Sequence, residues 1–224
     1  MGAFHALLVE GVPGIGKSTL IDALVRRHVA CAEPRRVQSF LHLAQTHTYG
    51  PLAPAEDAGT LTVEMNLALL DRIAETLEWL HADLRHGGKP CFVLIDSLHL
   101  THCLRPGVAA WADVAPIDRR LAETGCKLLL LTGSERTIWS RTVEGRAQSQ
   151  FILEYARKLG GTQEEIHAHF VAENAAFVRM FGQSALEKRS IANDSVPETA
   201  VDEAWAFWRG EPKPHAGDFL TMKA

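Results

Sequence analysis

The chain has 224 residues, of which 46% are apolar and 22% charged, with a formal net charge of -4. This length and composition fit one globular α/β domain, which we place at residues 1–210 with a tail at 211–224. The 23 basic residues are scattered, which argues against polymer nucleic acid as a partner. Because no segment is long and apolar enough to span a bilayer and the four cysteines lack C-x-x-C spacing, we expect a soluble cytoplasmic protein without disulfides.

Taken in chain order, the apolar patterns alternate between strand and helix. The continuous runs 91–96 and 127–132 are typical of parallel strands buried on both faces, and Thr162 with Glu165 forms a helix-capping signature. Strands are predicted at 6–9, 37–43, 91–96, 127–132 and 190–192, and helices at 19–28, 61–84, 134–143, 148–159, 162–180 and 197–208. The alternation predicts a five-stranded parallel sheet with helices on both faces.

The most specific motif is residues 11–18, here called the phosphate loop, which match G-x-x-x-x-G-K-[ST] at every fixed position. Its glycines let backbone N–H groups wrap anionic oxygens, at the positive end of the following helix. Lys17 is expected to reach the β- and γ-phosphates and the Ser18 hydroxyl to hold Mg²⁺. The residues predicted to bind ATP here are Pro13, Gly14, Ile15, Gly16, Lys17, Ser18 and Thr19.

Asp96 closes the apolar run 91–96, at the sheet edge where parallel α/β folds bind ligands. Two roles are open to this carboxylate: it can hold Mg²⁺ together with Ser18, or accept a proton from a substrate hydroxyl. The structural alternative is an Asp that caps a turn with Ser97.

Three arginines follow the strand 127–132, and a lid at about 134–150 would place them over the γ-phosphoryl group. We expect Arg141 and Arg146 to act in catalysis and Arg136 to bind the nucleotide. The alternative is a solvated helix face whose arginines pair with Glu135 and Glu144.

Together the phosphate loop, the strand ending at Asp96, the arginine segment and residues 188–194 resemble the P-loop kinases of the nucleoside-monophosphate kinase group, in particular the thymidylate-kinase-like and deoxynucleoside-kinase-like branch. The resemblance implies a P-loop NTPase fold with a small helical lid. It also implies that the segment from Lys188 to Asp194 lies beside the adenine of ATP. The Asp-Arg and Glu-Pro substrate signatures of that group are missing, since Ser97 follows Asp96.

The acceptor is expected to enter between the segment 45–51 and the chain after Asp96. The candidate acceptor-binding residues are Gln45, His47, Tyr49, His99 and Arg105. A polar surface loop is the alternative for 45–51. A zinc site at His99, His102 and Cys103 is disfavoured, because no second ligand pair has metal-site spacing.

These features favour an ATP- and Mg²⁺-dependent phosphotransferase acting on a small-molecule acceptor, either a nucleoside, a nucleotide, or an antibiotic or other hydroxylated metabolite. The alternative is a nucleotide-dependent switch or assembly ATPase with a protein partner. The long helix 61–84 can share its apolar stripe with a second subunit, with Trp79 as a contact in a homodimer.

Overall fold

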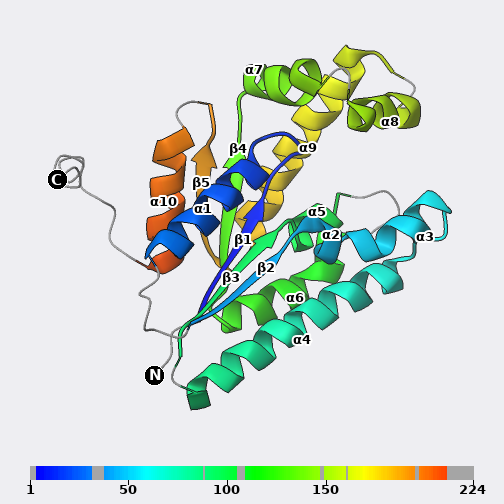
Figure 1. The fold of residues 1–224 in the computed structure, drawn as a ribbon. Coiled ribbons are helices and arrows are strands. Elements are labelled where there is room, and N and C mark those ends of the chain that lie inside the picture. Colours follow the sequence, from blue (N-terminus) through cyan, green and yellow to red (C-terminus); the bar gives the residue numbers. More distant parts are fainter. Residues whose placement is uncertain are drawn as a thin grey trace, which may run out of the picture.

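The computed structural model describes residues 4–31, 38–87, 89–104, 109–146, 149–159, 161–194 and 197–210. Its centre is a five-stranded, all-parallel sheet of order β2-β3-β1-β4-β5 (Figure 1). The strands are β1 (Phe4–Glu10), β2 (Ser39–Leu43), β3 (Cys91–Asp96), β4 (Lys127–Thr132) and β5 (Glu187–Ala192). The sheet and its parallel direction confirm the predicted fold class.

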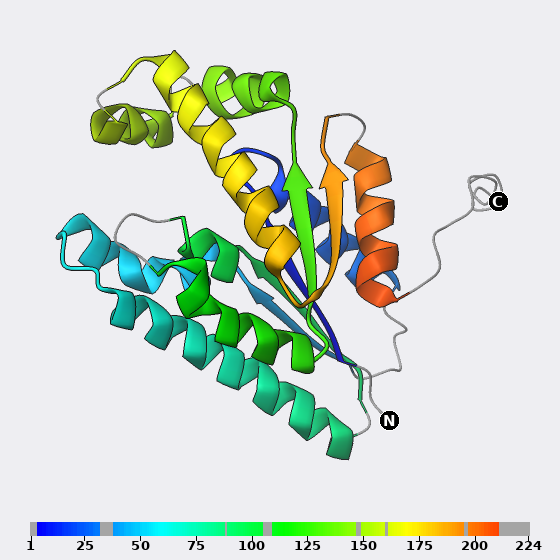
Figure 2. The ribbon, with the colours of Figure 1, turned by 180° about the vertical axis from the view of Figure 1, so that it is seen from behind.

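Helices cover both faces of this sheet, with α1 and α10 on one face and α6 and α9 on the other, where α4 packs against α6 (Figures 1 and 2). The helical segments of the first half are α1 (Lys17–Cys31), α2 (Gln45–Thr48), η1 (Gly50–Leu52), α3 (Ala53–Asp57), α4 (Val63–Gly87), α5 (His99–His102) and α6 (Trp111–Glu123). Those of the second half are α7 (Glu135–Ile138), the π-helical turn η2 (Trp139–Val143), η3 (Glu144–Arg146), α8 (Gln150–Leu159), α9 (Gln163–Gln183) and α10 (Pro197–Arg209).

The core lies on the three central strands, where every residue of β3 is buried and Leu7, Leu8 and Val9 of β1 have no exposed surface. Runs without polar alternation form such strands because helices cover both of their faces. The carboxyl ends of β1 and β3 therefore meet at one edge of the sheet, with Val9 opposite Asp96. This register brings the phosphate loop and the predicted acid to the same place.

The capping signature is confirmed: Glu165 N–H donates to Thr162 Oγ1 and Thr162 N–H donates to Glu165 Oε2 at the start of α9. Two regions differ from expectation. The segment 45–51, predicted as a loop, forms the short helix α2 and the start of η1, which leads into α3, and helix α6 was not predicted at all. In α6 the residues Val114 and Ile117 keep helical spacing toward the core, but Pro116 inside the helix argues against one from sequence.

All four cysteines are free thiols, and burial raises the pKa of Cys126 to about 12. Within the described ranges, no helix combines the length and apolar character needed to cross a membrane. The predicted tail at 211–224 lies outside those ranges.

His28, on the last turn of α1, is enclosed by aromatic rings and is 4% exposed. Its ring centroid lies 4.9 Å from that of Phe40, 4.6 Å from that of Phe92 and 5.7 Å from that of Trp208. Burial lowers the pKa of His28 below its ordinary value, and the charge of Arg209 lowers it further. The imidazole is therefore neutral in the folded protein at neutral pH.

Because the unfolded chain takes up this proton more readily, the contribution of His28 to stability is fully present above about pH 6.5 and is lost as the pH falls. We expect His28→Phe, which keeps an aromatic ring, to reduce the loss of unfolding free energy between pH 7.5 and 5.0 by up to about 1 kcal/mol. Urea denaturation at both pH values measures this difference. An identical loss in wild type and variant would contradict it.

Candidate nucleotide and acceptor site

The phosphate loop leaves β1 after Glu10 and enters α1 at Lys17, so its backbone lies at the edge of the sheet. Gly11 has φ 141°, and a Cβ at this position would lie 2.4 Å from the carbonyl oxygen of Leu131 on β4. Only glycine fits there, because the backbone needs positive φ and the neighbouring strand leaves no space. The Lys17 ammonium donates to the carbonyl oxygens of Gly11 (2.6 Å) and Val12 (3.3 Å), and so stays against the loop.

Two side chains from distant segments hold the loop from outside. Thr142 Oγ1, in η2, donates to the Pro13 carbonyl (2.9 Å), and Asn193 Nδ2, just after β5, donates to the Ile15 carbonyl (2.7 Å). These bonds use carbonyl groups of the loop and leave its N–H groups available to an anion. Neither residue was singled out by the sequence analysis as a contact of the loop, because no motif signals such a long-range bond.

Glu10 is a third residue that sequence reasoning missed, and it is completely buried. Its Oε1 accepts the N–H groups of Leu98 (2.8 Å), Leu100 (3.1 Å) and Thr101 (3.4 Å), and its Oε2 accepts the Thr101 hydroxyl (2.6 Å). A carboxylate with this many donors anchors the chain that follows β3. Glu10 therefore fixes α5 directly beside the phosphate loop.

Asp96 ends β3 and is only 8% exposed. Its Oδ1 accepts the Ser97 hydroxyl (3.0 Å), and its main-chain carbonyl accepts the Thr48 hydroxyl (3.1 Å). Ser97 has φ 61°, a left-handed conformation that non-glycine residues adopt at an energetic cost. The bond with Ser97 matches the predicted capping alternative, but the Asp96 side chain also faces the cavity described next.

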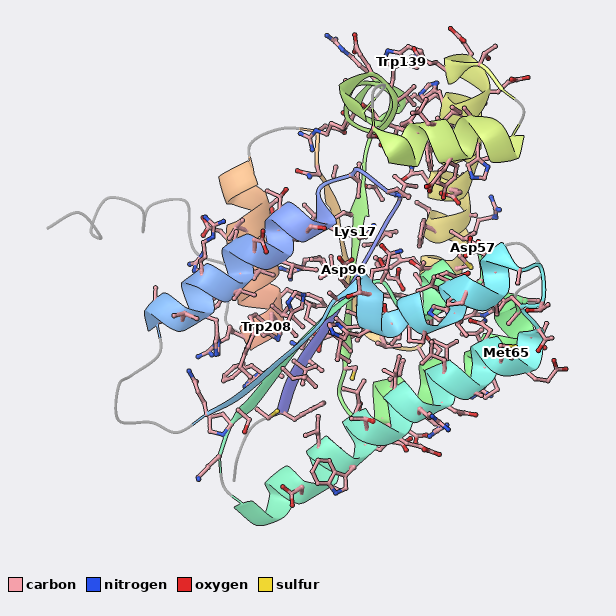
Figure 3. All side chains as sticks on the ribbon, turned by 45° about the vertical axis from the view of Figure 1, so that its right-hand side comes forward. Lys17, Asp57, Met65, Asp96, Trp139 and Trp208 are labelled. Carbon is pink, nitrogen blue, oxygen red and sulfur yellow. The ribbon has the colours of Figure 1, made fainter. Side chains whose placement is uncertain are left out.

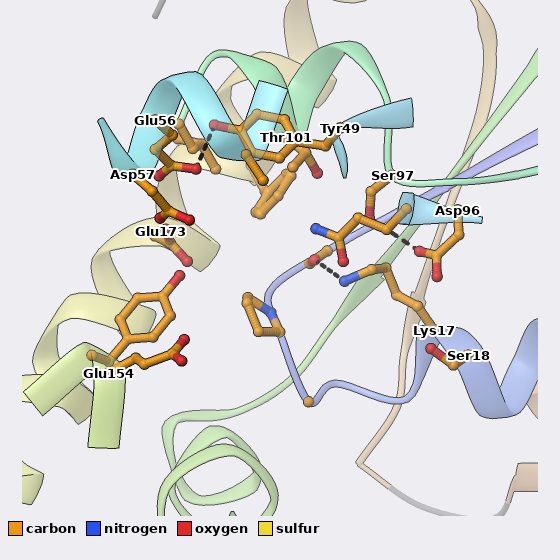
Figure 4. Close-up of a pocket in the computed structure, with 18 residues that line it drawn as sticks. Lys17, Ser18, Tyr49, Glu56, Asp57, Asp96, Ser97, Thr101, Glu154 and Glu173 are labelled. Atoms are coloured by element: carbon orange, nitrogen blue, oxygen red, sulfur yellow. Dashed lines mark hydrogen bonds between the residues drawn. The ribbon is translucent and has the colours of Figure 1, made fainter. Parts of the chain in front are cut away.

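A cavity of about 460 Å³ opens beside the phosphate loop (Figure 4). Figure 3 shows where three of its lining residues, Lys17, Asp57 and Asp96, lie in the fold. Lys17, Ser18 and Asp96 lie on one side of it. The opposite side is built from the segment 45–57 and from α8 and α9, and it carries Tyr49, Glu56, Asp57, Glu154, Tyr155, Glu173 and Phe177. The cavity thus joins a phosphate-binding loop to a separate wall of side chains.

A second cavity of about 280 Å³ lies on the other side of the loop, between α1, β4 and α10. Its wall is mainly apolar, and its polar side chains are Thr19, Arg141 and Asn193, beside Gly14 and Gly16. Apolar side chains with a few polar groups are the usual lining of a site for a flat ring. The phosphate loop is therefore flanked by two cavities of different chemistry.

The structure brings most of the predicted nucleotide-binding and acceptor residues together. Those that line the larger cavity are Pro13, Gly14, Lys17, Ser18, Gln45, Tyr49 and Asp96, and those that line the smaller one include Gly14, Gly16, Thr19 and Arg141. Ile15 contributes its carbonyl to the Asn193 bond, while its side chain is buried in the core.

Four predicted residues line neither cavity, and for two of them, Lys188 and His99, the structure corrects the assignment. His47 is exposed and accepts the Ala44 N–H (3.2 Å) at the start of α2, so it caps a helix. Arg136 is exposed on α7 and lines neither cavity. Lys188 lies at the opposite end of the sheet, near the start of β5, where it donates to the carbonyls of Gly182 and Ser184. It therefore cannot contact a base held beside the phosphate loop.

His99 is the second correction: it is fully buried and its Nε2 lies 2.9 Å from Asp118 Oδ1. Burial raises the pKa of Asp118, but hydrogen bonds from His99, from the N–H of Ala185 and from the Ser184 hydroxyl outweigh this and leave it below the ordinary value. His99 thus belongs to a polar network that ties α5 to α6 and the end of α9. Arg105 and the Arg146 side chain lie outside the described residues.

Ser18 and Asp96 supply hard oxygen donors to the same cavity, which suits Mg²⁺. Within the described ranges, no three His, Cys, Asp or Glu side chains form a group able to hold a metal ion. Mg²⁺ is commonly bound by one or two protein oxygens together with substrate phosphates and water. The residues present therefore fit Mg²⁺ that would arrive with a nucleotide, with the Ser18 hydroxyl as a protein ligand and the Asp96 carboxylate facing the same cavity.

The all-parallel sheet and the phosphate loop after its central strand define a P-loop NTPase-like α/β protein. A solved structure with this fold is the YorR protein of Bacillus subtilis in complex with phosphorylated GDP. The TM-score is 0.54 with 10% sequence identity, over 88% of this chain and 92% of that one.

Among curated proteins, the DNA polymerase III subunit delta' of Escherichia coli is 33% identical over 128 residues, which cover 54% of this chain. The match spans about a third (34%) of the length of that protein. No protein-family model matches the chain.

Proposed function

We propose that the protein is a Mg²⁺-ATP-dependent phosphotransferase that moves the γ-phosphoryl group to a hydroxyl of a small molecule. The observation that carries the proposal is the cavity of about 460 Å³, in which Lys17 and Asp96 face a separate wall across space for an acceptor. A protein that only binds or hydrolyses nucleotide has no need of such a wall. The similarity to YorR, solved with a phosphorylated nucleotide, supports the proposal through the fold.

In this proposal ATP lies across the phosphate loop. Its base and ribose occupy the smaller cavity between α1 and α10, where Arg141 and Asn193 provide polar contacts. Its triphosphate follows the loop N–H groups and the positive end of α1. The γ-phosphate then reaches the larger cavity, next to Lys17 and Ser18.

Transfer begins when the acceptor hydroxyl oxygen attacks the γ-phosphorus. A new O–P bond forms, the bond between the γ-phosphorus and the β,γ-bridging oxygen breaks, and ADP leaves with that electron pair. Asp96 accepts the proton of the hydroxyl, and Lys17 stabilises charge on the phosphate oxygens. Mg²⁺, when bound, supplies further charge neutralisation at the phosphates.

The direct test is a Mg²⁺-ATP consumption assay with pools of nucleosides, nucleoside monophosphates and other hydroxylated metabolites, antibiotics included. We expect ADP release that depends on one pool and is absent from Lys17→Ala. Tight ATP binding without stimulation by any pool would overturn the proposal.

Asp96→Asn separates the two roles of this carboxylate. If it accepts the proton, the amide should leave the Kd for Mg²⁺-ATP within about twofold and lower kcat by about 10²- to 10⁴-fold. Calorimetric titration and initial rates measure the two quantities. A loss of Mg²⁺-ATP affinity as large as the loss of rate would instead identify Asp96 as chiefly a Mg²⁺ ligand.

A second candidate function is an ATPase that acts with a protein partner. The observation in its favour is the 33% identity with a DNA polymerase III subunit over 54% of this chain. Such a protein should hydrolyse ATP faster with a macromolecular partner, whereas a phosphotransferase should respond to a small acceptor. The same ATP assay, with a bacterial protein extract in place of the pools, distinguishes the two.

A further inference from the structure

The contacts of Asp96 point to a role for the residue that follows it, and this role rests on the proposed function. We propose that Ser97 is a positioning residue of phosphoryl transfer: its hydroxyl holds the Asp96 carboxylate in the orientation in which the carboxylate accepts the proton of the acceptor. Ser97 acts through Asp96 and takes no proton itself.

The two side chains lie next to each other in the wall of the larger cavity (Figure 4). The Ser97 hydroxyl donates to Asp96 Oδ1 over 3.0 Å, and the two residues are only 1% and 8% exposed. The terminal torsion of an aspartate is broad, so a carboxylate without a donor is poorly fixed in orientation. A hydrogen bond to a charged acceptor is about twice as strong as a neutral one. This bond therefore assigns Oδ1 to Ser97 and Oδ2 to the reaction.

The backbone conformation of Ser97 is what allows the bond. Along an extended strand, successive side chains point to opposite faces of the sheet, so neighbours in sequence lie apart. Ser97 directly follows β3 and has φ 61°, a left-handed conformation that ends this alternation. The turn at Ser97 brings its hydroxyl back onto the carboxylate of the preceding residue.

Main-chain bonds on both sides hold this strained turn in place. The Ser97 N–H donates to the Val9 carbonyl of β1 over 3.0 Å. The next N–H, that of Leu98, donates to the buried Glu10 Oε1 over 2.8 Å. A non-glycine residue keeps such a conformation only where its surroundings fix it, and residues of this kind concentrate at functional sites. The strain at Ser97 thus lies beside the carboxylate to which the proposed function gives the proton.

The residue type at this position adds a further argument. Glycine would adopt the left-handed conformation without strain, but it has no hydroxyl to donate. The Asp-Arg signature of the kinases that the chain resembles has a cation after the acid, whereas here a neutral donor follows Asp96. Serine therefore supplies a hydrogen bond to the carboxylate without adding a charge to the cavity.

The first test removes the hydroxyl in two ways. Ser97→Ala loses the bond and keeps the strain, whereas Ser97→Gly loses the bond and relieves the strain. We expect both variants to lower the maximal rate of acceptor-stimulated ADP release by about 10-fold, with the Kd for Mg²⁺-ATP within about twofold of wild type. Urea denaturation should give Ser97→Gly the higher midpoint of the two. Equal rates at unequal stability would separate the positioning role from a structural one.

The rate is measured with Mg²⁺-ATP and whichever of three pools stimulates wild type: nucleosides, nucleoside monophosphates, or other hydroxylated metabolites. The matched control is Ser184→Ala. The Ser184 hydroxyl also donates to a buried carboxylate, that of Asp118 (2.6 Å), but neither residue lines either cavity. We expect this control to lower the urea midpoint and to leave the rate within about twofold of wild type.

The second test asks whether Ser97 acts through Asp96. In an Asp96→Asn background, Ser97→Ala should change the remaining rate by less than about twofold, because the carboxylate that the hydroxyl positions is gone. A separate structural effect of Ser97 would instead lower the rate by the same factor in both backgrounds.

Three results would overturn the inference. These are rates within about twofold of wild type in both Ser97 variants, an equal loss with and without the Asp96 carboxylate, and a loss of Mg²⁺-ATP affinity as large as the loss of rate. In each of them wild type still transfers phosphate, so the proposed function stands. No stimulation of wild type by any pool would overturn both.

Discussion

Replacement of Lys17 by alanine is expected to lower the rate of phosphoryl transfer by about 10³-fold or more, because the ammonium is the one cation that the phosphate loop itself carries into the reaction. The side chain contacts the Gly11 and Val12 carbonyls, on the loop that would hold the phosphates. Its removal takes away charge stabilisation in a cavity with several carboxylates, where no neighbouring cation can replace it among the described lining residues.

The measurement is kcat/KM for the preferred acceptor together with the Kd for Mg²⁺-ATP. The natural control is Lys188→Ala, because this lysine lies at the far end of the sheet and bonds the carbonyls of Gly182 and Ser184. We expect that control to transfer phosphate at the wild-type rate. A Lys17→Ala protein that keeps more than a tenth of the activity would show that the loop lysine has little part in transfer.

Replacement of Glu10 is expected to have the largest effect on stability. Glu10→Ala leaves the N–H groups of Leu98, Leu100 and Thr101 and the Thr101 hydroxyl without their buried acceptor. Buried donors without a partner cost about 1–3 kcal/mol each, although such losses are not additive, so we expect unfolding free energy to fall by about 4 kcal/mol. Glu10→Gln keeps one acceptor oxygen and should lose less.

Urea denaturation followed by tryptophan fluorescence measures the unfolding free energy of each protein. We expect it to decrease in the order wild type, Glu10→Gln, Glu10→Ala. Glu75→Ala, a change at an exposed residue, is the control and should stay near wild type. If Glu10→Ala does not fold, the glutamine variant still reports the effect. Since α5 also places Thr101 in the wall of the larger cavity, Glu10→Gln should raise the acceptor KM more than the ATP KM. A glutamine variant as stable as wild type would contradict the anchoring role.

The acid side chains of the larger cavity change how the resemblance to nucleoside-monophosphate kinases is interpreted. The phosphate loop and Asp96 occupy the positions that this resemblance implies, and the sheet agrees with it. The acceptor side differs, because no described arginine lines the cavity while carboxylates do. The sheet and the phosphate loop thus agree with the resemblance at the level of a P-loop NTPase-like fold, whereas the resemblance does not account for the acids on the far side of the cavity.

The errors of prediction have a common physical origin. The sequence places His99 three residues after Asp96, which suggests a common site, but one turn of α5 directs it toward Asp118 in the core. Lys188 shares a segment with Asn193, yet an extended strand separates them by its whole length, so only Asn193 reaches the phosphate loop. Closeness in sequence did not predict closeness to the site, because strand and helix geometry decides direction.

The sequence by itself determined those features that depend on residues close together in the chain. The loop motif, the apolar runs of β1, β3 and β4 and the capping pair at Thr162 and Glu165 depend on residues only a few positions apart, so pattern alone predicts them. Only the tertiary structure decided three other features. These are the hydrogen bonds from Thr142 and Asn193 to the phosphate loop, the burial of Glu10, and the acidic side chains that α3, α8 and α9 bring to one cavity. These features arise when separate elements pack together, and packing between distant segments leaves no periodic signal in a single chain.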